Sequence, residues 1–118
     1  TAPYGIAAQE VLDKSGLYAE VKPKLVFGES VGQTLSYAMR ATDVGFVAMS
    51  SLYSPKLRQL KQGQEWIAIE PSLYSPIKQG IVLLKKGEKS SDAKAFYDFM
   101  LGEKAREILK AYGYQLPH

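Results

Sequence analysis

The stretch LVFGESVGQTLSYAMRATDVGFVAM, residues 25–49, decides the fold of this 118-residue chain. An apolar run, Leu25–Phe27, leads into a short loop with glycine; a helical pattern follows over Val31–Arg40, and a second apolar run covers Val44–Met49. Ser30 stands where a helix N-cap belongs, and Gln33, three residues later, completes the spacing of a capping box. The order strand, loop, capped helix, strand predicts one unit of a parallel sheet.

The loop before the helix also has a chemical meaning. A helix that starts at the carboxyl end of a strand presents free backbone N–H groups and the positive end of its dipole. The opening residues Thr1-Ala2-Pro3-Tyr4-Gly5 have the composition of a second helix start. Two such starts facing one cleft would form a site for a small anion without any Lys or Arg.

The remaining chain continues the alternation of helices and strands. We expect helices over 5–14, 31–40, 54–60, 92–101 and 103–112, with Gly16 and Gly113 ending the first and the last. We expect strands over 24–27, 44–49, 66–69 and 81–84, and the run from Val44 to Met49 is apolar enough for burial on both faces. Strands separated by helices indicate an α/β fold.

Length and composition are those of about one globular domain. The net charge of +3 is too small and too scattered for a nucleic-acid surface, because such a surface needs a dense basic stripe. No run of residues approaches the roughly 20 apolar positions of a membrane span. The chain has no Cys, and its only histidine is His118, which we do not expect to be a ligand. Because the sequence begins abruptly at a helix start, we expect it to be a fragment of a longer protein.

An enzymatic function is disfavoured by the side chains that are present. Glu29 could act as a general base, but it has no histidine beside it, and a helix dipole or backbone amides explain an acid at this position. Ser50 and Ser51 follow a strand but lack the Gly-x-Ser-x-Gly elbow of a serine nucleophile. We therefore expect no enzyme and no metal-coordinating residues.

Several segments, in their order along the chain, resemble the C-terminal half of periplasmic molybdate-binding proteins of molybdate ABC transporters. The similar segments are TAPYGIAA (1–8), LVFGESV (25–31), VGFVAMS (44–50), YSPIKQGI (74–81) and the region from Ala95 to Tyr114. Each motif is moderately specific, and the ordered set covers nearly the whole chain.

The resemblance implies the fold and its division. The fold class would be α/β, a periplasmic binding protein-like (type II) lobe with a parallel-type sheet flanked by helices. Residues 1–78 would form one α/β lobe, and residues 79–118 would form the C-terminal strand and helices that return to the other lobe.

The resemblance also implies a ligand and a site. Tyr4 and Val31 would each offer a backbone N–H to an oxygen of molybdate or tungstate, with Ser30 supporting Val31 as the N-cap. Some family members have a Tyr that reaches the anion at the position of Ala48, so this contact is lost here. No cofactor and no directly coordinated metal is implied, and the hydroxyl-bearing loops of the other lobe lie outside this sequence.

The implied partners are a small oxyanion and the membrane permease of an ABC transporter, with no nucleic acid. The implied location is the periplasm, or a lipid-anchored extracellular position in a Gram-positive source. Because apolar segments after residue 79 would lose their lobe, we also expect self-association of the fragment. An alternative is an oxyanion-sensing effector domain of a transcriptional regulator with the same fold, and a more distant one is a hydrolase or transferase of α/β type.

Overall fold

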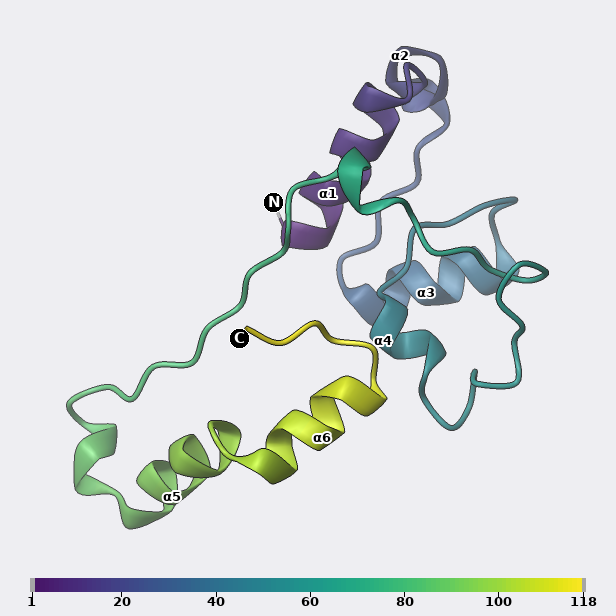
Figure 1. The fold of residues 1–118 in the computed structure, drawn as a ribbon. Coiled ribbons are helices and arrows are strands. Elements are labelled where there is room, and N and C mark those ends of the chain that lie inside the picture. Colours follow the sequence, from purple (N-terminus) through teal and green to yellow (C-terminus); the bar gives the residue numbers. More distant parts are fainter. Residues whose placement is uncertain (1, 118) are drawn as a thin grey trace.

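The computed structural model describes residues 2–117 as an open, elongated arrangement of helices joined by long connections (Figure 1). Thr1 and His118, the latter being the only histidine, lie outside the described residues. The helices and 3-10 turns are, in chain order, α1 (Pro3–Lys14), α2 (Tyr18–Val21), η1 (Lys22–Lys24), α3 (Val31–Arg40), α4 (Met49–Leu52), η2 (Pro71–Leu73), η3 (Gly87–Lys89), α5 (Ser91–Met100) and α6 (Glu103–Ala111).

The four longer helices confirm the sequence prediction to within two residues at each end. Local signals set these boundaries: Ser30 and Ser90 accept a hydrogen bond from the third backbone N–H of α3 and of α5. Gly16 and Gly113, which follow α1 and α6, have φ angles of 71° and 81°. Such angles favour glycine, and they turn the chain away from the helix axis.

The predicted strands are not formed in the described residues, so the parallel-type sheet stays a prediction. Between residues 2 and 117 the pairing is limited to one isolated parallel bridge, Gln62 with Trp66. A strand exists only when a neighbour completes its hydrogen-bond ladder, and the four apolar segments run singly. Many of their side chains remain exposed as a result, with Phe27 at 80% and Val44 at 84% of full exposure, although Ala48 is buried.

The helix expected over residues 54–60 is also absent. These residues form consecutive turns, whereas the end of the predicted strand at Met49 begins the short helix α4. Trp66 fixes the region that follows, because its Nε1 donates to the Leu60 carbonyl at 3.2 Å and its ring meets the Tyr53 ring edge-on, with centroids 6.4 Å apart. The packing of Tyr53 against Trp66, together with the Trp66–Leu60 hydrogen bond, thus fixes this region in place of the expected helix.

The packing is sparse for a chain of this length. The radius of gyration is 17.1 Å, against about 13.5 Å for a compact domain of the same size. In the described part of the chain, the buried apolar residues are Val11, Ala48, Leu52 and Ala105. Much apolar surface is therefore left without a partner.

Two contacts hold η2 and the start of the long connection that follows it against α1. The backbone N–H of Ser75 donates to the Glu10 carboxylate at 2.6 Å, and Lys14 Nζ donates to the Ser72 carbonyl at 3.4 Å. The connection then leaves α1 and leads to the α5–α6 pair at the opposite end of the molecule (Figure 1). No helix in residues 2–117 has both the length and the apolar character needed to cross a membrane.

Candidate functional site

The start of α3 carries the best-defined group of predicted site residues. Ser30 has an extended backbone (φ −148°, ψ 163°), and its Oγ accepts from the Gln33 N–H at 3.1 Å. The Gln33 side chain returns the contact, since its Oε1 accepts from the Glu29 N–H at 2.6 Å. This is the predicted capping box with one change. The Gln33 side chain accepts from the N–H of Glu29, one residue before the N-cap, rather than from the N–H of Ser30 itself.

The cap leaves a donor free. The backbone N–H of Val31, the first helical residue, has no hydrogen-bond partner among residues 2–117. The first turn of α3 contains no acidic side chain, so nothing in the helix itself neutralises the positive end of the dipole. The start of α3 can therefore receive an anion through backbone N–H groups alone.

A close approach at Gly28 shapes the turn into α3. A Cβ at this position would lie 2.8 Å from the Thr34 backbone nitrogen and would clash with Thr34 Oγ1. Glu29, the candidate general base of the sequence, uses its backbone rather than its carboxylate in the cap, and its side chain is exposed. The loop has the geometry of a helix start and supplies no acid–base pair.

The start of α1 is built differently. Pro3 occupies the first helical position, and the N-cap residue Ala2 provides no side-chain hydrogen bond. The Tyr4 N–H, like that of Val31, has no partner in the described part of the chain. Burial raises the pKa of the Tyr4 phenol above its ordinary value of 10.0; interaction with Tyr114 raises it further, and the Gln79 side chain lowers it.

Ala48 lies at the N-cap position of α4 and is only 6% exposed. Its buried methyl group offers no donor, which agrees with the loss of the tyrosine hydroxyl noted in the sequence. Whether an anion reaches this position stays a prediction.

The structure places the predicted residues on three separate helix starts. α1 and α3 do not pack against each other. Tyr4 and Val31 therefore reach a common anion only across the space between these helices, and that shared cleft stays a prediction. Residues 2–117 contain no group of three or more potential metal-ligating side chains.

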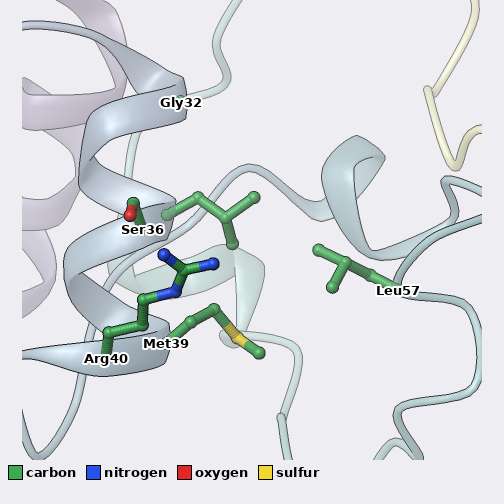
Figure 2. A pocket seen from close by; sticks show the side chains of 6 residues that line it. Gly32, Ser36, Met39, Arg40 and Leu57 are labelled. Atoms are coloured by element: carbon green, nitrogen blue, oxygen red, sulfur yellow. The ribbon is translucent and has the colours of Figure 1, made fainter.

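Two hollows were not found from the sequence. One, of about 320 Å³, lies along α3 and is lined by Gly32, Leu35, Ser36, Met39, Arg40 and the facing Leu57 (Figure 2). The other, of about 200 Å³, lies between the first turns of α1 and residues 75–78. Neither is lined by Val31 or Tyr4, and no local sequence signal predicts them, because each joins segments that are distant in the chain.

Comparison with known proteins finds a family and relatives that match nearly the whole chain. Residues 1–115 match the family described as bacterial extracellular solute-binding protein. The chain is 44% identical to the molybdate-binding protein ModA of Azotobacter vinelandii over 98% of its own length and 45% of that protein. It is 43% identical to the ModA protein of Rhodobacter capsulatus, over 97% of its length and 43% of that protein.

A solved structure extends the similarity to the backbone. The chain aligns with the periplasmic molybdate-binding protein of Azotobacter vinelandii with a TM-score of 0.82 and 35% identity, over 98% of its length and 50% of that structure. It thus shares a periplasmic binding protein fold over this length. The chain spans about half the length of the relatives it matches.

Proposed function

Because the chain belongs to the bacterial extracellular solute-binding protein family, we propose that it forms part of the solute-binding component of a molybdate ABC transporter. The observation that carries the proposal is the start of α3, a capped helix whose first N–H is unpaired and whose first turn lacks an acid. The similarity to two proteins named as molybdate-binding supports molybdate or tungstate as the ligand.

Neutral donors suit this ligand. Tetrahedral molybdate carries two negative charges and only acceptor oxygens, and each charge-assisted hydrogen bond contributes about 1.5–3 kcal/mol net. In the proposed site, Val31 and Tyr4 donate through the backbone, Ser30 holds the helix start, and Ala48 leaves one possible donor missing. Size, rather than charge, separates molybdate from sulfate, since both are dianions.

The proposed role is binding and transport, without catalysis and without a cofactor. The regulator alternative is disfavoured because the relatives described above are named as binding proteins. The expected partner is the membrane permease of the transporter. The expected location is the periplasm, with a lipid anchor as the arrangement in a Gram-positive source.

The finer architecture belongs to the same proposal. Residues 1–78 form one lobe, and residues 79–118 return to a second lobe, where the apolar run Ile81–Leu84 pairs as a strand of a parallel-type sheet. Two features support this division: the long connection that separates α5–α6 from α1–α4 (Figure 1), and the exposure of Val82 at 75% and Leu84 at 67%.

We also infer that the 118-residue chain associates with itself when no other lobe covers it. Its accessible surface is 9698 Å², against about 6,300 Å² for a compact protein of this mass. The excess is larger than the roughly 1,200–2,000 Å² that stable complexes bury. Light scattering should show a species heavier than 13.0 kDa, and a compact monomer would contradict this inference.

The function is tested by adding anions to the 118-residue chain and following its amide NMR signals. Molybdate and tungstate should shift the Tyr4 and Val31 signals at low affinity, because this chain holds only part of the site. Sulfate and phosphate at equal concentration are the controls for charge. Shifts spread over Lys and Arg residues, or equal shifts with all four anions, would refute a molybdate site.

A further inference from the structure

The two side chains that hold residues 72–75 come from one side of α1. Glu10 and Lys14 are four residues apart in this helix, so they lie next to each other on its surface. The Glu10 carboxylate accepts from the Ser75 N–H at 2.6 Å. Lys14 Nζ donates to the Ser72 carbonyl at 3.4 Å. Both contacts are made with the backbone, so they fix the path of the chain whatever side chains it carries there.

The two backbone groups that α1 binds are those that would close a β-turn. In a hydrogen-bonded turn of four residues, the first carbonyl accepts from the fourth N–H. Here the Ser72 carbonyl and the Ser75 N–H are bound by α1 instead. Tyr74 between them has an extended backbone (φ −149°, ψ 159°), unlike the third residue of a type I or type II turn. α1 thus holds the chain open where it leaves η2.

Glu10 and Lys14 also have an alternative partner in each other. A Glu four residues before a Lys is the favourable order for an ion pair along a helix. Within residues 2–117 the ion pair that forms is instead Lys104 with Glu107, in α6. The two charges of α1 are therefore directed to the connection, although each could leave it and still find a partner on its own helix.

The surroundings of Glu10 permit such a change. A hollow of about 200 Å³ lies between the first turns of α1 and residues 75–78, and both Glu10 and Ser75 line it. Pro76, the next residue, has no N–H that could take over the contact with Glu10. Ser75 and Lys14 are exposed, so water can replace either contact. Beyond this point the connection has neither helix nor strand up to residue 84.

We propose that Glu10 and Lys14 form a releasable clamp on residues 72–75, which sets the direction in which the connection leaves α1 for α5 and α6 (Figure 1). In the clamped state both side chains bind the backbone of the connection. In the released state they pair with each other along α1, and the freed backbone groups bind water. Because no charged group loses a partner in this exchange, the α5–α6 pair can change its position without unfolding α1. The inference concerns no ligand and does not rest on the proposed function.

The clamp is tested by exchanging its two charges. Glu10→Lys combined with Lys14→Glu keeps the composition, the net charge and an ion pair along α1. It places an ammonium beside the Ser75 N–H and a carboxylate beside the Ser72 carbonyl, so a donor faces a donor and an acceptor faces an acceptor. The clamped state is lost while the released state remains. Hydrogen exchange of the Ser75 N–H, followed by NMR, should become about two- to tenfold faster, the range for one lost hydrogen bond.

The matched control is the same exchange of charges in α6. Lys104 and Glu107 form an ion pair at 3.5 Å, and Lys104→Glu combined with Glu107→Lys reverses it far from Ser75 in the sequence. Hydrogen exchange at Ser75 should not change in this control. Circular dichroism should show that both double variants keep the helix content of the unaltered chain, because unfolding of α1 would also release Ser75.

The effect on α5 and α6 is read from distances. The chain has no Cys, so Gln9→Cys in α1 and Lys94→Cys in α5, both at exposed positions, provide unique sites for a pair of spin labels. The distribution of distances between the labels should be broader when the charges of α1 are exchanged, and it should be unchanged in the α6 control. Dilution with unlabelled chain removes distances between copies.

A single substitution replaces the charge exchange if that variant loses helix content. Glu10→Ala removes the acceptor and introduces the best helix former, and Asp13→Ala, which removes an exposed carboxylate of the same helix, is its control. Ser75 exchange should become faster only in Glu10→Ala. Unchanged Ser75 exchange in the folded variants would overturn the clamp. Faster Ser75 exchange with an unchanged distance distribution would overturn its control of the α5–α6 position.

Discussion

α3 and α5 begin with nearly the same cap and differ in what that cap offers to a ligand. Both are ten-residue helices with a serine N-cap, and the hydrogen bond from the third helical N–H is 3.1 Å in α3 and 3.2 Å in α5. α5 has Asp92 in its first turn, whereas the first turn of α3 has no acid. In α5 a carboxylate lies within the first turn, at the positive end of the dipole, whereas in α3 the nearest acid, Glu29, precedes the helix.

The comparison separates folding from binding. A serine cap stabilises a helix wherever it occurs, so its presence alone does not indicate a site. A first helical turn without an acidic side chain, next to a loop tightened at Gly28, is the feature that permits an anion to bind. The two helices therefore provide a matched pair in which the same substitution should have different effects on ligand binding.

The largest difference should come from proline at the first helical position. Val31→Pro removes the donor N–H, and the extended Ser30 backbone already suits a residue before proline. Molybdate affinity in an NMR titration should fall roughly tenfold to a hundredfold, the equivalent of one charge-assisted hydrogen bond. Ser91→Pro in α5 is the control and should leave affinity unchanged. Equal effects of the two variants would remove the distinction between the helices.

A smaller difference should follow from adding charge. Gln33→Glu keeps an oxygen that can accept the Glu29 N–H and adds a negative charge near the start of α3. Helix stability should rise by about 0.3–1 kcal/mol, and molybdate affinity should fall by about tenfold through repulsion. Asp92→Asn in α5 should lower stability by a similar amount without changing affinity. Urea unfolding and anion titration together check the opposite signs, and tighter molybdate binding by Gln33→Glu would contradict an anion at α3.

Removing the caps should have equal effects on stability and unequal effects on binding. Ser30→Ala and Ser90→Ala should each cost about 1 kcal/mol in the free energy of unfolding, measured in urea. Only Ser30→Ala should also weaken molybdate binding, by a few-fold, because the Val31 N–H loses its fixed direction. A cap loss at Ser90 that weakened binding equally would show that the effect is general destabilisation.

The smallest expected effect concerns pH and extends the comparison to α1. The phenol of Tyr4 has a pKa raised above 10.0 in the folded chain, so folding favours its protonated form. The resulting stability is fully present below pH 10 and is lost as the pH rises through the folded-state pKa. Tyrosine NMR signals should show one phenol that titrates late, and Tyr4→Phe should remove it. A late-titrating phenol that persists in Tyr4→Phe would assign the shift to another residue.

The sequence predicted what is encoded locally. The Ser30–Gln33 spacing and the positions of Gly16 and Gly113 lie within one helical turn of the boundaries that they set, and those boundaries were correct. The short helix α4 was missed because Met49–Leu52 continues an apolar run that favours a strand. The strands stay a prediction, because an apolar segment specifies pairing only when a neighbour is present.

The candidate site likewise has a part that is encoded locally and a part that depends on distant residues. The free N–H at Val31 follows from the cap and could be read from the sequence. Two of the groups that shift the pKa of Tyr4, Gln79 and Tyr114, lie more than 70 residues from it in the chain, and nothing in the local pattern of any of the three residues indicates this. Long-range effects of this kind depend on the path of the whole chain.

The connection between η2 and α5 has a consequence for the lifetime of the protein. Residues 75–84 have neither helix nor strand; the segment contains the exposed Lys78 and is followed by the exposed Lys85 and Lys86. Proteases bind their substrates as extended chains, and exposed loops are where nicking concentrates. Cutting there would release α5 and α6, which retain one buried residue, Ala105, between them. Anything that covers this segment would therefore protect the chain from degradation as well as complete its packing.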